Sequence, residues 1–147
     1  MNMTNDEYKK YTERHAPRSP VWKNLCGAFV IGGLICVVGQ FLLNLWSAAG
    51  LDEESTATAT SISMVFLGAV LTGLGLYDKL AKRAGAGTLV PITGFANSMV
   101  APALEFKTEG FITGTAAKMF IIAGPVIVYG LSASVIYGLI LVLFGLA

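Results

Sequence analysis

The chain has 147 residues, of which 54% are hydrophobic and only 13% charged, with a formal net charge of +1 and a mean hydropathy of +0.68. Soluble domains carry roughly 25% charged residues, so this composition excludes an ordinary soluble enzyme. The near-zero net charge gives no basic field for DNA or RNA and excludes a nucleic-acid partner.

Four long runs contain no acidic or basic residue: residues 24–51, 55–77, 84–104 and 119–147, which are 28, 23, 21 and 29 residues long. Uncharged apolar runs of about 18 residues or more are typical of membrane spans. We therefore predict an all-α integral membrane protein in a lipid bilayer. Its transmembrane domain (24–147) would be a small bundle of about four segments (24–48, 55–77, 84–104 and 119–146), preceded by a polar head (1–23).

The head contains a pattern that is typical of a helix start. Thr4 and the acid Glu7 fit a capping box, in which each residue's side chain bonds the other's backbone. The pattern predicts a short helix over residues 5–15. Tyr8 and Tyr11 share one face of it, so the helix either lies on the membrane surface or is a solvated tail.

The first apolar run begins and ends near tryptophans, Trp22 and Trp46, which are 24 residues apart. This separation is about 36 Å along a helix, so each indole can lie at one membrane interface. The run is too long for the apolar part of a signal peptide, and we expect it to be retained. One face has small or polar residues at offsets of 3, 4, 4 and 3. This polar stripe either lines a solute path or bonds neighbouring helices; it comprises Gly33, Cys36, Gln40, Asn44 and Ser47.

The distribution of cations predicts the orientation. Residues 1–23 contain five Lys or Arg and residues 78–83 contain three, whereas the acidic loop 52–54 contains none. Cytoplasmic loops carry the excess of Lys and Arg. The N-terminus and residues 78–83 should therefore face the cytoplasm, and residues 52–54 the other side.

The third run has an unusual composition for a membrane helix. Residues 85–97 contain three Gly, two Thr, one Pro and one Asn. Irregular backbone at membrane depth must be covered by protein or line a cavity. We therefore expect a broken segment. It either crosses fully or returns as a re-entrant hairpin; its length of 21 residues favours a full crossing, which would leave the C-terminus inside.

The second and last runs have faces of small residues at helical spacing, which allow close helix packing and indicate a bundle that oligomerises. Lys118 immediately precedes the last run. It is either a lysine reaching the interface from a helix end or a fixed cation for an anionic solute. The expected packing residues are Gly68, Thr72 and Gly75 in the second run and Gly130, Ser134 and Gly138 in the last.

The sequence has no pattern that is typical of catalysis. There is one histidine, His15, and no acid lies in an apolar run. Cys26 and Cys36 are about 15 Å apart along one helix, beyond disulfide reach. We expect no catalytic residues, no metal site, no cofactor and no enzymatic activity.

Three motifs resemble the stage V sporulation protein A membrane family of the AC and AE type: GGLICVVGQ at 32–40, GAVLTGLGLY at 68–77 and GAGTLVPITGFAN at 85–97. The long polar head is more similar to the AC type. The resemblance implies a channel subunit in the inner membrane of the bacterial forespore and spore. Such a channel moves dipicolinic acid, with calcium, into the forming spore and out at germination, and is regarded as sensitive to membrane tension. The implied partners are the stage V sporulation proteins AD and AE.

A rigid dianion such as dipicolinate could be met by the dipole ends of broken helices. Our hypothesis for the solute path therefore starts from the third run, with Thr93 and Asn97 as donors one turn apart. The full set of candidate residues is Thr93, Gly94, Asn97, Gln40, Asn44 and Lys118. The alternative function is a structural scaffold subunit of the same complex that conducts nothing.

Overall fold

The structure is a computed structural model that describes residues 4–15 and 20–145. All regular elements in these ranges are helical, which confirms the all-α class. In chain order they are α1 (Asn5–His15), α2 (Val21–Ala48), α3 (Glu53–Gly73), α4 (Tyr77–Ala84), α5 (Ala86–Leu89), α6 (Ile92–Glu105), the 3₁₀ turn η1 (Lys107–Glu109), the π-helical turn η2 (Phe111–Ala116) and α7 (Ala117–Leu143).

Three helices are long and apolar enough to cross a membrane: α2, α3 and the part Ala123–Leu143 of α7. The third uncharged run contributes none, because it is divided among α4, α5 and α6. An all-α membrane protein with a broken third segment is therefore confirmed: three helices are long enough to span a membrane, and the third uncharged run is not one of them.

The predicted capping box is present at the start of α1. The Thr4 backbone N–H donates to Glu7 Oε2 at 2.9 Å, and the Glu7 N–H donates to Thr4 Oγ1 at 3.4 Å. Asp52 caps α3 in a related way, accepting from the Ser55 N–H at 3.2 Å. These hydrogen bonds from Ser55 hold the pKa of the Asp52 carboxyl below its usual range. The acids of loop 52–54 thus begin α3 where the helix dipole favours negative charge.

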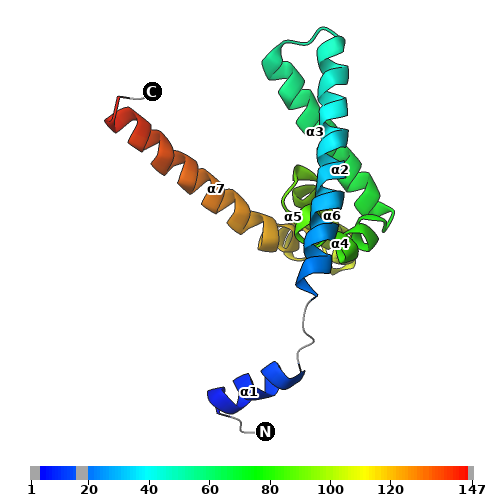
Figure 1. Cartoon of the computed structure of the whole chain (residues 1–147), viewed down its shortest axis with the longest axis vertical. Helices are drawn as coiled ribbons and strands as arrows, with labels where there is room; N and C mark the ends of the chain where they lie inside the picture. Colours follow the sequence, from blue (N-terminus) through cyan, green and yellow to red (C-terminus); the bar gives the residue numbers. More distant parts are fainter. Residues whose placement is uncertain (1–3, 16–19, 146–147) are drawn as a thin grey trace.

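Helices α2 and α3 form an antiparallel hairpin (Figure 1). Gly50 makes its turn with φ +88°, a conformation that favours glycine. Gly75 makes a second such turn, with φ +66°, after α3. Helix α3 therefore ends at Gly73, four residues before the end of the uncharged run 55–77, and Tyr77 begins α4.

The segment 84–104 enters and leaves at the same end of this hairpin. Going up along α2, Gly27 lies against the Arg83 backbone, and Ala28 and Gly32 lie against Gly87. Going down along α3, Gly68 lies against Thr93, and Thr72 bonds Asn97. The chain thus rises along α2 through α5 and descends along α3 through α6.

This path is the re-entrant alternative, so the full crossing that we favoured from length is not adopted. The reason is the two backbone breaks. Gly85 has φ +48°, and Pro91 has ψ 158°, which leaves α6 with 14 residues. A helix of 14 residues is about 21 Å long, short of the roughly 30 Å hydrocarbon core.

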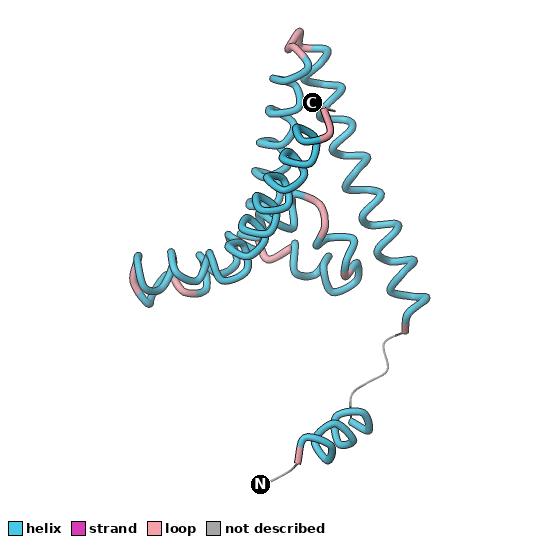
Figure 2. Tube along the Cα trace, turned by 90° about the vertical axis from the view of Figure 1, so that its left-hand side faces the viewer, coloured by secondary structure: helices cyan, strands magenta, loops and turns pink. Residues whose placement is uncertain are grey.

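Helix α7 starts beside α6 and η2 and then diverges from the α2–α3 hairpin (Figures 1 and 2). Its last described residues lie toward the end of the molecule that holds the α2–α3 turn in both views. With a re-entrant third segment, the end of α7 would thus lie on the side opposite to the start of α2, whereas a full crossing would have placed it on the same side.

Candidate functional site

The break between α5 and α6 is organised around the hydroxyl of Tyr77, the first residue of α4. This hydroxyl donates to the Thr88 carbonyl oxygen at 2.7 Å and lies 3.0 Å from Thr93 Oγ1. Tyr77 is only 2% exposed, and Thr88 and Thr93 are also buried. The Thr88 carbonyl oxygen and the Thr93 hydroxyl at the break therefore have a partner inside the protein, as polar groups at membrane depth require.

A second polar contact joins α6 to α3. The Thr72 hydroxyl lies 3.0 Å from Asn97 Oδ1 and 2.7 Å from the carbonyl oxygen of Gly68. Gly68 itself approaches α6 closely, since an added Cβ would lie 3.0 Å from Thr93 Cα. Gly68 and Thr72, two of the expected packing residues, thus both contact α6.

The solute path that we proposed in the third run is largely occupied by these contacts. Thr93 is 5% exposed and its hydroxyl is shared with Tyr77. Gly94 lies so close to the carbonyl oxygens of Thr88 and Leu89 that a Cβ would overlap them. Asn97 is half-buried against Thr72. In the described arrangement Thr93 and Gly94 hold the re-entrant turn together, and an anion contact by Asn97 stays a prediction.

The polar stripe of α2 has the opposite environment, because all five of its residues are exposed. Gln40 Nε2 donates to Asn44 Oδ1 at 2.9 Å, within the stripe itself. At 100° per residue, the stripe lies about 140° around α2 from its packed face. That packed face contains the half-buried residues Gly27, Ala28, Ile31, Gly32, Ile35, Gly39, Leu42 and Trp46.

Lys118 lies at the start of α7, at the end of the molecule where α6 finishes. Its ammonium nitrogen is 4.6 Å from the centroid of the Phe106 ring, a cation–π contact that ties α7 to the end of α6. The side chain is half-buried. This position fits a lysine reaching the interface from a helix end. Lys118 is far from Gln40 and Asn44 in the sequence, and α7 makes no substantial contact with α2.

The small-residue face of α7 is open. An added Cβ at Gly130 or Gly138 would meet no atom within 4 Å, and the exposed Ser134 hydroxyl bonds only the carbonyl oxygen of Gly130, at 2.9 Å. A face for close helix contact is therefore present without a partner helix in the described chain. Gly75 differs from the prediction: it also has no neighbour within 4 Å, and it permits the turn after α3.

Tyr77 is the residue that sequence reasoning missed. We treated it as the end of the second span, yet it anchors the whole break through Thr88 and Thr93. A signal was present, because a tyrosine just after a glycine turn can place its hydroxyl against freed carbonyls. In the described ranges no three His, Cys, Asp or Glu residues lie together as metal ligands would.

Comparisons with known proteins agree on one family. Residues 24–140 match the model of the SpoVAC/SpoVAEB sporulation membrane protein family. The chain is 43% identical over 141 residues to the stage V sporulation protein AC of Bacillus subtilis (strain 168), covering 94% of both chains. No solved structure matches it. The matched range covers most of each of the three long helices and all of the re-entrant segment, and the chain belongs to the SpoVAC/SpoVAEB sporulation membrane protein family.

Proposed function

We propose that this chain is a subunit of a membrane channel that moves dipicolinic acid, with calcium, into the forming spore and out at germination. The protein would lie in the inner membrane of the forespore and spore, with its N-terminus in the cytoplasm, and open under membrane tension. Its assembly partners would be the stage V sporulation proteins AD and AE. Membership of a sporulation membrane family supports this setting.

The observation that carries the proposal is the exposure of the α2 polar stripe. Gln40 and Asn44 belong to a 28-residue helix with the hydropathy of a membrane span, yet they face away from α3 and the re-entrant segment. Polar side chains at membrane depth face a bundle interior or a water-filled cavity rather than lipid. A path bounded by α2 stripes of several subunits would give these amides water and solute as partners.

The geometry also argues that one chain does not enclose a path. The packed contacts of α2 are made with α3, α4 and α5, on the far side of the helix from the stripe. The conducting assembly therefore needs further subunits, either copies of this chain or its partners. The open face of α7 supplies a second surface for such contacts.

A non-conducting scaffold is the second candidate, and the open α7 face favours it. In that case the stripe would bond another helix, at about 0.6 kcal/mol per hydrogen bond. The two functions differ in what the stripe amides affect. A path-lining amide affects solute flux at a normal amount of complex, whereas a helix-bonding amide affects the amount of complex.

The test is dipicolinate release from spores that carry Gln40→Leu or Asn44→Leu, normalised to the amount of complex in the inner membrane. We expect several-fold slower release at an unchanged amount of complex. Phe41→Leu is the matched control, because Phe41 neighbours the stripe and is 65% exposed without being polar. Normal release per complex from both stripe variants would refute a path along α2, and a parallel loss of complex would favour the scaffold.

A further inference from the structure

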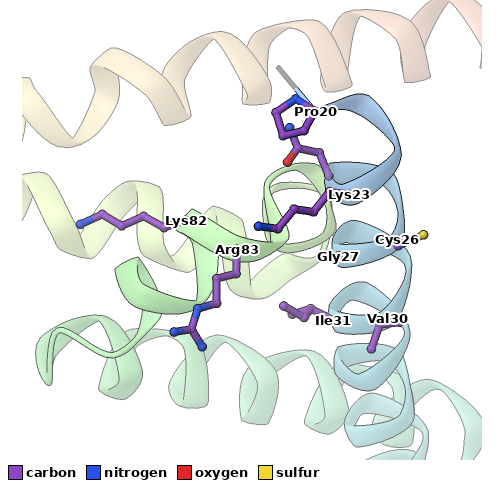
Figure 3. A pocket seen from close by; sticks show the side chains of 9 residues that line it. Pro20, Lys23, Cys26, Gly27, Val30, Ile31, Lys82 and Arg83 are labelled. Carbon is purple, nitrogen blue, oxygen red and sulfur yellow. The ribbon is translucent and has the colours of Figure 1, made fainter. Parts of the chain in front are cut away.

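Two hollows flank the crossing of α2 with α4 and α5. They have volumes of about 560 and 460 Å³ and share Asn24, Lys82 and Arg83 in their linings. The larger hollow also includes Lys23 (Figure 3). We call the polar end of these hollows, formed by Lys23, Asn24, Lys82 and Arg83, the basic groove.

The basic groove brings together cations from two elements that are far apart in the sequence. Lys23 extends from the first turn of α2 toward α4, which carries Lys82 and Arg83 (Figure 3). All three side chains are exposed and, within the described part of the chain, none has an ion-pair partner. None of the residues that line either hollow is acidic. The groove therefore presents uncompensated positive charge.

The acids of the same region line a different hollow. Asp78, on the first turn of α4, lines a separate hollow together with Thr72 and Glu105. Lys82 follows Asp78 by one turn on the same face of α4. Lys23 and Arg83 have no acidic residue beside them in the lining of either hollow. Lys23 and Arg83 thus leave a ligand of negative charge as the natural partner of the groove.

The larger hollow continues from the cations onto an apolar wall. Val30 and Ile31 line it seven and eight residues beyond Lys23 along α2. That distance is about 10–12 Å in the direction in which α2 crosses the membrane. A ligand that fits the whole hollow has a charged end at the membrane surface and an apolar chain below it.

We propose that the basic groove binds an anionic phospholipid, with the phosphate held by Lys23, Lys82 and Arg83 and an acyl chain against Val30 and Ile31. Arginine matches phosphate oxygens with paired N–H donors, and the Asn24 amide supplies a further donor. Basic pockets between helices at the cytoplasmic face are typical of such headgroups. A free dianion would contact the cations alone and leave the apolar wall exposed. An acyl chain covers that wall, so the wall favours a lipid over a free anion.

The test uses the purified full-length chain in neutral detergent, with bound lipid counted by native mass spectrometry. The probes are phosphatidylglycerol, phosphatidylcholine, glycerol phosphate and dipicolinate. We expect phosphatidylglycerol to bind at least tenfold more tightly than phosphatidylcholine, and neither glycerol phosphate nor dipicolinate to displace it. The readout is lipid binding alone, so it is independent of whether the protein conducts dipicolinate.

The variant Lys82→Gln/Arg83→Gln should lose on the order of fivefold in affinity per cation removed. Both residues are exposed, so the fold should tolerate the change. The matched control Lys9→Gln/Lys10→Gln removes the same charge from α1 and should bind as the unmodified chain does. An equal loss of affinity in the control would mean that the effect depends on the net charge of the chain and not on the groove. Displacement by glycerol phosphate or dipicolinate would show a site for a free anion, and either result would overturn the proposal.

Discussion

The substitution Gly87→Ala tests the re-entrant packing, because α5 contacts α2 at this residue. An added Cβ at Gly87 would lie 2.8 Å from Ala28 Cα and overlap the Ala28 carbonyl oxygen. Carbon atoms in contact are normally about 3.5–4.0 Å apart. Backbone cannot rotate away as a side chain can, so α5 and α2 must separate by roughly 1 Å to accommodate one methyl group.

The expected cost follows from this displacement. Overpacking a close contact destabilises by about 1–3 kcal/mol. Alanine is favoured over glycine in helices by about 1 kcal/mol, but α5 has only four residues and gains little of this. We therefore expect Gly87→Ala to lower the free energy of unfolding by about 1–3 kcal/mol.

The assay is thermal unfolding of the purified protein in detergent, with Gly73→Ala as the matched control. Gly73 ends α3 and has no atom within 4 Å of an added Cβ, so the control should be as stable as the unmodified chain or slightly more. Equal midpoints for Gly87→Ala and Gly73→Ala would refute the close contact of α5 with α2. The re-entrant path would then have to be abandoned.

Three further predictions concern orientation, assembly and the break. In a cysteine-free background, an impermeant thiol reagent applied from outside should label Glu53→Cys and spare Lys82→Cys, because cations remain inside; the reverse labelling would invert the topology. Ser134→Leu should reduce the amount of assembled complex, measured by co-purification, since it fills the open face of α7; normal assembly would mean that this face meets lipid. Tyr77→Phe leaves the buried Thr88 carbonyl oxygen without its donor and should lower the stability by about 1–3 kcal/mol, measured by thermal unfolding; an unchanged midpoint would deny Tyr77 its anchoring role.

Local signals in the sequence predicted the helices well. The capping pair Thr4 and Glu7 located the start of α1, and the structure ends that helix at His15 as expected. The composition of residues 85–97 predicted a break, which the structure has at Pro91. These features depend on neighbours in the chain, which is why patterns in the sequence capture them.

The path of the third segment depends on contacts between distant residues. The return of α6 along α3 is set by the approach of Gly68 to Thr93 and by the pair Thr72 and Asn97, which are 25 residues apart. Length alone favoured a crossing, because 21 uncharged residues can span a bilayer if they form one helix. The same contacts explain why Thr93, expected to be a free donor, is buried against Tyr77.

Thiol accessibility shows directly whether the α2 stripe faces water in the assembled complex. In a background with Cys26→Ala and Cys36→Ala, Gln40→Cys and Phe41→Cys place single thiols on adjacent exposed positions of α2. A charged, water-soluble thiol reagent is applied to germinating spores, and both labelling and dipicolinate release are measured. If the α2 stripe faces water, Gln40→Cys reacts and slows release, whereas Phe41→Cys remains unlabelled in lipid. Protection of Gln40→Cys, or equal labelling at both positions, would contradict it.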